Sequence, residues 1–166
     1  MWVIIKFDKK KLTSLKDEFF KKLGSKPIFY SPKIKIQNYS KLKLNNKEVL
    51  LLGDYILCFH IRFSNKNIFN TLRYCKGVKY FLNGFSKAQL EIIEFIDRCK
   101  LNEDSQGFIQ QSFFDFKNNK KFKFLSGPFT NNIFKIIEEN KFYIKASIGK
   151  LNTKFSKEDY LFSPIW

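Results

Sequence analysis

The chain has 166 residues, of which 44% are hydrophobic, and its 31 Lys and Arg against 15 Asp and Glu give a formal net charge of +16. This length supports one or two small domains with cores of their own and is too short for a multidomain enzyme. No apolar run reaches the ~18 residues of a membrane helix, and the first residues lack the pattern of a signal peptide. We therefore expect a cytoplasmic protein that makes no membrane contact.

The positive charge is concentrated in the first part of the chain. Residues 1–100 carry 21 basic and 8 acidic side chains, whereas residues 101–166 carry 10 and 7. Between positions 26 and 47 there are six lysines and no acidic residue. Such a segment attracts a polyanion through Coulomb force and counterion release. It is equally typical of a solubilising loop, because the frequent Lys, Phe, Ile and Asn are what an AT-rich coding sequence produces.

The first fifty residues predict two strands and a helix. Residues 2–7 are an apolar run typical of a strand, and residues 12–23 repeat apolar side chains at helical spacing, with Gly24 placed to end the helix. Residues 27–37 alternate in polarity and predict a second strand that bends at Pro32. A lysine-rich turn region is expected over residues 38–47.

The next fifty residues contain the clearest periodicity. Apolar residues occupy every second position over 55–63, which predicts a half-buried strand. A short helix is expected over 67–74, a strand over 78–82, and a helix over 86–99. We expect Ser86 to cap that last helix, and the residues expected to point inward are Leu90, Ile93 and Ile96. The order of elements predicts an α+β domain with helices on one face of a mainly antiparallel sheet.

The composition changes after residue 100. Polar residues without periodicity predict a linker over 101–115. Beyond it, turn signals near 126–128 and 139–140 separate short strands, which are expected at 122–125, 133–137, 142–148 and 153–155. We therefore predict a domain at 1–100 and a small β-barrel at 116–166. Residues 133–145 would also tolerate a helix, but the turn signals favour the barrel.

The sequence offers little for catalysis. His60 is the single histidine, and no acid or nucleophile stands at motif spacing from it. There is no glycine-rich phosphate loop and no nucleophile motif of the Gly-x-Ser-x-Gly type. Cys58, Cys75 and Cys99 are an odd number at wide spacing, so we expect reduced core thiols rather than a disulfide framework or a zinc site. We predict a binding protein without catalytic residues, metal or cofactor.

Four short motifs resemble NusG-type transcription elongation factors in their order and approximate spacing. They are Trp-Val-Ile at 2–4, Leu-Leu-Gly-Asp-Tyr-Ile-Leu at 51–57, Gly-Val-Lys-Tyr-Phe-Leu at 77–82 and Gly-Pro-Phe at 127–129. The resemblance implies an NGN-like domain at 1–100 followed by a KOW-like barrel. The family's Phe-Pro-Gly-Tyr reads Leu52-Gly53-Asp54-Tyr55 here, and the glycine that marks a KOW motif is absent. With these departures, the chain resembles a specialised paralogue of the RfaH type more than the housekeeping factor.

The resemblance also implies contacts with RNA polymerase. Leu52, Tyr55 and Leu57 match an apolar depression that binds the clamp helices of the largest subunit, although the same residues could instead face the domain's own core. Asn70 and Thr71 match the contact with a gate loop on the other large subunit. A monomer would thus bridge the two sides of the polymerase cleft.

Contact with the non-template DNA strand is implied for a further set of residues. Arg73 and Lys76 match the region that meets this strand, and Tyr74 is available to stack on a base. The lysines that we expect to extend this phosphate-tracking surface are Lys33, Lys35, Lys41 and Lys43.

The function expected from this resemblance is transcription elongation and antitermination, in which polymerase binding suppresses pausing or termination. The C-terminal barrel would bind a ribosomal protein or Rho. Two other readings stay open: an RNA- or ribosome-binding KOW protein without polymerase binding, and an interaction protein whose basic surface reflects codon usage alone.

Overall fold

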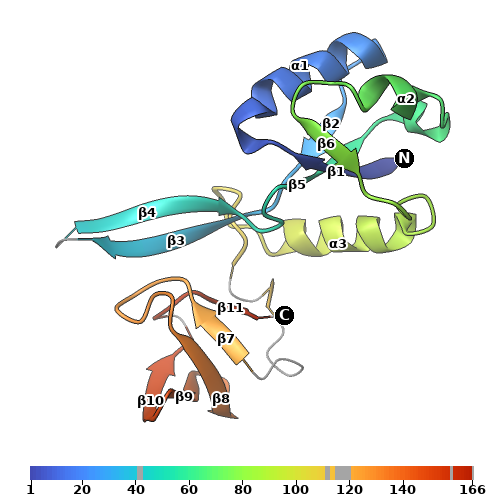
Figure 1. The fold of residues 1–166 in the computed structure, drawn as a ribbon. Helices are drawn as coiled ribbons and strands as arrows, with labels where there is room; N and C mark the ends of the chain where they lie inside the picture. Colours follow the sequence, from blue (N-terminus) through green and yellow to red (C-terminus); the bar gives the residue numbers. More distant parts are fainter. Residues whose placement is uncertain (41–42, 111–112, 115–120, 158, 166) are drawn as a thin grey trace. The chain divides into compact units, whose positions relative to one another are not determined.

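The computed structural model describes residues 1–40, 43–110, 113–114, 121–157 and 159–165, with no account of the side chains between 37 and 46. The chain divides into two compact units (Figure 1). The first comprises Met1–Pro32 and Leu50–Cys99, and the second comprises Lys33–Val49 and Lys100–Trp166. The first hundred residues are therefore interrupted, because residues 33–49 belong to the second unit.

The first unit is built on a four-stranded antiparallel sheet with the strand order β2-β5-β1-β6. The strands are β1 (Trp2–Phe7), β2 (Ile28–Tyr30), β5 (Tyr55–Phe59) and β6 (Val78–Phe81). Alternate residues of β1 are fully buried. This arrangement confirms the predicted α+β class with an antiparallel sheet.

Three helices accompany the sheet. They are α1 (Leu12–Leu23), which follows a 3-10 turn η1 (Lys9–Lys11), α2 (Ile68–Leu72) and α3 (Gln89–Leu101). The predicted end of the first helix is confirmed: Gly24 has a φ of 72°, and its N–H donates to the carbonyl of Phe20. Glycine reaches this left-handed conformation without the steric cost that a Cβ would add.

The helices cover both faces of the sheet, so the prediction of helices on one face is wrong (Figure 1). Val3 and Ile5 of β1 pack in one core with α1 and α2. Leu57 of β5 packs in another core with Ile92 and Ile96 of α3. The alternation in the sequence marks two faces, but it does not show that the second face is also buried.

The predicted strand over 55–63 is too long. Strand β5 ends at Phe59, and a 3-10 turn η2 (Ile61–Ser64) follows. The change of direction occurs at His60, whose ring accepts a hydrogen bond from the N–H of Arg62 at 3.1 Å. A local hydrogen bond of this kind competes with continued strand pairing.

The inward face of α3 also differs from the prediction. Ile92, Ile96 and Cys99 are buried, whereas Leu90 is 75% exposed and Ile93 is 42% exposed. Ser86 precedes the helix, which begins at Gln89. The Gln89 side chain sets this orientation, because its amide accepts from the N–H of Trp2 at 2.9 Å and donates to the Trp2 carbonyl at 2.8 Å.

The predicted turn region over 38–47 is wrong, because most of it is strand. Strands β3 (Lys33–Ser40) and β4 (Lys43–Leu50) form a two-stranded sheet. The predicted strand over 27–37 is divided at Pro32 into β2 and β3, as the expected bend implied. A ladder of backbone hydrogen bonds needs no apolar side chains. A lysine-rich segment can therefore form strands although its composition predicts a turn.

The second unit contains a five-stranded antiparallel sheet with the order β10-β9-β8-β7-β11. The strands are β7 (Lys121–Phe124), β8 (Ile133–Glu139), β9 (Tyr143–Ile148), β10 (Leu151–Ser156) and β11 (Phe162–Pro164). Four match the predicted strands, and β11 was not predicted. The described residues of 130–160 contain no helix, in agreement with the predicted β state.

Aromatic rings fill the core of this sheet. The ring of Phe155, on edge strand β10, lies 5.9 Å from that of Phe162 on the other edge strand β11 and 5.1 Å from Phe124 on β7, between centroids. Rings from both edges can share one core only if the sheet curls, as in a small barrel. Ring pairs at these distances add to the stability gained by burial.

Part of the predicted linker is folded. The Asp104 carboxylate accepts hydrogen bonds from the N–H groups of Gln106 and Phe108, at 2.8 and 2.9 Å. Phe108 and Ile109 are buried, and the Ile109 N–H donates to the Lys33 carbonyl at 2.7 Å. A short polar stretch therefore forms a packed turn rather than an extended tether over 101–110; residues 111–112 and 115–120 lie outside the described part.

The ring of Phe124 lies within 6.3 Å of the rings of Phe134, Phe155 and Phe162. We expect Phe124→Ala to lower the free energy of unfolding of the second unit by ~3–5 kcal/mol, because it removes a fully buried ring and leaves a cavity among the surrounding aromatic side chains. Ile133→Ala, at an exposed position of the same sheet, is the matched control and should cost less than ~1 kcal/mol. Denaturant unfolding followed by near-ultraviolet circular dichroism measures both; equal losses would contradict the assigned core.

Candidate functional site

An open apolar groove of about 390 Å³ lies between the sheet of the first unit and α3. Its lining residues are Ile4, Leu52, Tyr55, Leu57, Leu82, Glu91, Ile92 and Phe95. Ile4 and Leu57 are paired in the register of β1 and β5, so both side chains point to the face that carries α3. The three residues expected to bind polymerase clamp helices, Leu52, Tyr55 and Leu57, thus line one groove.

These three residues differ in accessibility. Leu57 is 2% exposed and packs with Ile92 and Ile96, so it forms the floor of the groove and belongs to the domain core. Leu52 and Tyr55 are half-buried and form the rim. Leu57 therefore faces the domain's own core, whereas Leu52 and Tyr55 are partly accessible from the groove.

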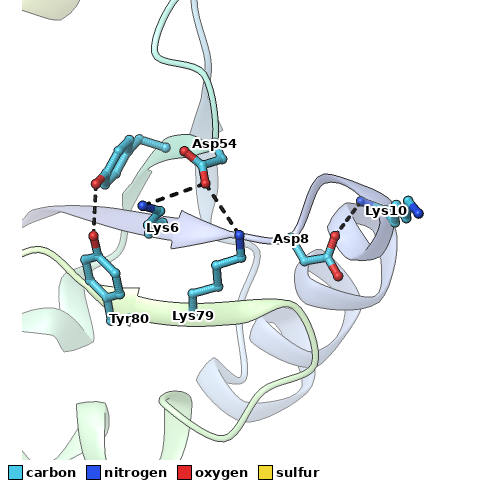
Figure 2. Close-up of polar contacts among 7 residues, drawn as sticks. Lys6, Asp8, Lys10, Asp54, Lys79 and Tyr80 are labelled. Atoms are coloured by element: carbon cyan, nitrogen blue, oxygen red, sulfur yellow. Dashed lines mark hydrogen bonds and ion pairs between the residues drawn. The ribbon is translucent and has the colours of Figure 1, made fainter.

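A polar row adjoins the groove at Tyr55. Lys6 is paired in register with Tyr55 on one side and with Tyr80 on the other, so the three side chains stand in line across β5, β1 and β6. The two tyrosine hydroxyls are hydrogen-bonded at 2.9 Å (Figure 2). The Lys6 ammonium lies 5.3 Å from the centre of the Tyr55 ring and 5.5 Å from that of Tyr80. Such distances are typical of cation–π contacts.

Asp54 anchors two lysines beside this row. Its carboxylate lies 3.9 Å from the Lys6 ammonium and 3.5 Å from that of Lys79 (Figure 2). The negative charge of Asp54, followed by the two tyrosines, raises the pKa of Lys6. The hydrogen bond to Tyr80 raises the pKa of Tyr55. Lys6 therefore remains an ammonium group and the Tyr55 hydroxyl remains protonated at neutral pH.

Sequence reasoning missed Lys6 and Tyr80. The available signal was a lysine at an alternating position of an otherwise apolar strand. Which strands flank β1, and in which register, follows only from the tertiary structure.

The residues expected at the gate loop and the DNA lie together on and after α2. Asn70, Thr71, Arg73, Tyr74 and Lys76 are all exposed, with Tyr74 at 78%. The Arg73 guanidinium donates a hydrogen bond to the Asn70 side-chain oxygen and lies 6.0 Å from the Tyr74 ring. These contacts hold an arginine and a tyrosine side by side, an arrangement suited to a phosphate and a base.

A second basic segment lies next to these residues. The N–H of Asp8 donates to the carbonyl of Gly77 at 2.8 Å, and a Cβ on Gly77 would lie 3.0 Å from the Lys11 side chain. The η1 turn, Lys9–Lys11, therefore packs against the chain just after Lys76. The Asp8 carboxylate caps this turn by accepting from the N–H of Lys10 at 3.0 Å (Figure 2). Sequence reasoning missed this triple lysine, although an uninterrupted basic run was visible.

The remaining lysines predicted to bind nucleic acid belong to the second unit. Lys33 forms an ion pair with Glu48 at 3.2 Å, and the Lys35 ammonium lies 5.6 Å from the centre of the Phe108 ring. Lys41 lies outside the described residues, and the side chain of Lys43 is not described.

The net charge is uneven along the sequence but equal in the two structural units. The first unit holds 15 basic and 7 acidic side chains and the second holds 16 and 8, so each carries +8. The asymmetry between residues 1–100 and 101–166 arises because the lysine-rich segment 33–49 precedes residue 100 in sequence but belongs to the second unit.

His60 has a structural role. It is 5% exposed, its Nδ1 accepts from the Arg62 N–H, and its Nε2 lies 2.7 Å from the Ser25 hydroxyl. Because Nδ1 accepts, the proton of the neutral ring is on Nε2 and is donated to Ser25. Burial, followed by the positive charges of Arg62 and the N-terminal amine, lowers the pKa of His60.

The three cysteines are buried, and none of them forms a disulfide. Burial raises the pKa of the Cys58 and Cys75 thiols, so both are protonated and poor nucleophiles. Within the described ranges, no three His, Cys, Asp or Glu side chains are grouped so that they could hold a metal ion. Nor does any helix in that part of the chain have the length and apolar character needed to span a membrane.

No family model and no curated protein matches this chain. Among solved structures, a chain of an MjSpt4:Spt5 complex in conformation B is similar over 99% of this chain and 98% of its own length, with 11% identity and a TM-score of 0.36. A structure of Thermotoga maritima NusG that describes its domain interaction is similar over 99% and 97%, with 16% identity and a TM-score of 0.34. Likenesses at these identities and TM-scores establish neither family nor activity.

The His60 environment predicts a pH dependence of stability. Since the folded state lowers the pKa of His60, the unfolded chain binds the proton more readily below pH ~6.5. The contribution of His60 to the free energy of unfolding should therefore be fully present above that pH. It should decrease as the pH falls toward the pKa of His60 in the folded state. Urea unfolding of the wild type and of His60→Gln between pH 8 and pH 5 measures this. The variant should lose the dependence, and an unchanged slope would contradict the assignment.

Proposed function

We propose that this protein is a NusG-type transcription elongation factor that binds RNA polymerase across its cleft and suppresses pausing or termination. The observation that carries the proposal is the apolar groove beside α3. The residues that the sequence resemblance assigns to clamp-helix binding, Leu52, Tyr55 and Leu57, line this one surface.

The groove has the chemistry of a helix-binding surface. Its floor is fixed by Leu57 and Ile92, which are buried, so little order must be gained on binding. Its rim offers Tyr55, a residue type that often dominates interface energies because one ring supplies both apolar area and a hydroxyl. An amphipathic helix would bury its apolar ridge here.

The position of α2 supports the proposed bridging of the cleft. Leu72 of α2 packs in the core with α1, on the face of the sheet opposite the groove. Asn70 and Thr71 are exposed on α2, so the two expected polymerase contacts lie on opposite sides of the sheet. A ligand that binds both sides only when the clamp is closed stabilises that state by its differential affinity. Shorter pauses are the expected result.

The surface around Arg73 is proposed to hold the non-template strand. Arg73, Tyr74 and Lys76 are exposed on the same domain, and Lys9–Lys11 add positive charge next to them. Lysine contacts to phosphate supply affinity without sequence information, so any sequence preference would come from Arg73 or Tyr74.

One observation favours a second candidate, an RNA- or ribosome-binding protein. The second unit carries +8 once the segment 33–49 is counted with it, which is as much as the first unit. A basic β-barrel unit is suited to structured RNA. In the first proposal the same unit binds a ribosomal protein or Rho, for which its exposed Phe142 and Leu151 offer apolar contacts.

Purified full-length protein should bind core RNA polymerase and shorten pauses in single-round transcription. We expect Tyr55→Ala to weaken polymerase binding about 10-fold or more while the domain stays folded, because the ring is removed from the rim without opening the core. Leu90→Ala, a change at an exposed α3 residue outside the groove lining, is the control and should bind normally. Equal polymerase binding by both variants would contradict the proposal. So would binding of the protein to ribosomes without binding to polymerase.

The DNA contact can be tested separately by the salt dependence of single-stranded DNA binding. Arg73→Ala with Lys76→Ala should lower the magnitude of the slope of log K against log salt by about 1.4, because two phosphate contacts at ~0.7 each are lost. Lys16→Ala with Lys87→Ala removes the same charge elsewhere on the first unit and should change the slope less. Similar slopes for the two pairs would show that no particular phosphate surface exists.

A further inference from the structure

We infer that the groove selects an amphipathic helix that carries a carboxylate next to its apolar ridge, and that this carboxylate binds at Lys6. The inference rests on the proposed function, in which the helix belongs to the polymerase clamp. It adds a requirement on the partner's chemistry that comes from the polar row Tyr55, Lys6 and Tyr80.

The row continues the groove. Ile4 lines the groove, and Lys6 is the next residue of β1 that points to the same face of the sheet. Tyr55 belongs to both, since it lines the groove and is paired in register with Lys6. A helix lying in the groove and extending past Tyr55 would therefore cover the Lys6 ammonium.

The row offers hydrogen-bond donors without an equal number of acceptors. The ammonium of Lys6 carries three N–H donors, and its one ion-pair partner among the described residues, Asp54 at 3.9 Å, is shared with Lys79. Two ammonium groups and one carboxylate leave a local charge of +1. One tyrosine hydroxyl donates to the other at 2.9 Å, which leaves the second hydroxyl proton available to a ligand.

Covering this row with an apolar helix would be unfavourable. An ammonium that loses its water without gaining a counter-charge costs more free energy than the apolar contact returns. A partner carboxylate removes this penalty, because it can accept from the ammonium and from the free hydroxyl proton in charge-assisted hydrogen bonds. Neutral or basic residues at this position are thereby selected against.

The opposite charge stands at the far end of the groove. The Gln89 side chain holds the start of α3 to the backbone of Trp2, so the nearby groove residue Glu91 lies toward the Trp2 end of β1. Lys6 is four residues further along β1, which is ~13 Å at 3.3 Å per residue. No ion pair of Glu91 occurs among the described residues. This polarity favours one direction of the bound helix, with its acidic residue at Lys6.

A phosphate is a poorer match for the same row than a carboxylate on a helix. Asp54 stands 3.9 Å from the ammonium, Glu91 lies at the same groove, and the surface between them is apolar. A polyanion would meet both carboxylates without using the groove.

The test measures binding of the full chain to core polymerase. Lys6→Met keeps the apolar stem and removes the charge, so we expect affinity to fall about 5-fold, and Lys6→Glu should reduce it about 30-fold or more. Lys16→Met and Lys16→Glu, on α1 at the opposite face, are the matched controls and should bind normally. Thermal unfolding should confirm that all four variants are folded.

A charge exchange identifies the partner group. Acidic residues of the polymerase clamp helices are changed singly to Lys, and one of these changes should restore binding of Lys6→Glu while weakening that of the wild type. Loss of binding in Tyr55→Ala together with normal binding of both Lys6 variants would overturn the inference and leave the proposed function standing. Normal binding in all three would remove both. Lower DNA affinity of Lys6→Met with unchanged polymerase affinity would also overturn the inference.

Discussion

Burial of strand β5 on both of its faces is the constraint on which the first unit depends. Ile56 and Cys58 belong to the core shared with α1, whereas Leu57 between them belongs to the core beneath α3. A strand with two apolar faces must be covered by helices on both sides. Tyr55 and Lys6 lie on the same face of the sheet as this core, but α3 covers them only in part. The groove is the part of this face that α3 does not cover.

The two-sided cover separates two kinds of surface. The α3 face offers an apolar groove that ends in a lysine between two tyrosines, and the opposite face offers the exposed polar residues of α2. A single small domain thereby has an apolar surface and a polar surface on opposite sides of its sheet. The first suits a helix and the second suits a loop or a nucleic acid strand.

The lysine-rich segment shows how sequence position can mislead about charge. Residues 33–49, which include β3 and most of β4, belong to the second unit, so a charge that is concentrated in the first hundred residues is shared equally by the two units. The barrel-like unit is thus as basic as the groove-bearing unit. Net charge alone therefore does not assign the nucleic acid contact to one of them.

The sequence by itself determined the elements whose periodicity reflects one buried face, such as α1 with its Gly24 cap and strands β7 to β10. It also predicted a site at Leu52, Tyr55 and Leu57, through motifs that resemble a family, and these residues line one groove. Only the tertiary structure decided which of these is floor or rim, which face of α3 is inward, and that Lys6 stands between Tyr55 and Tyr80. The physical reason is that burial and strand register are relations between distant segments, whereas periodicity reports only the local alternation of side chains.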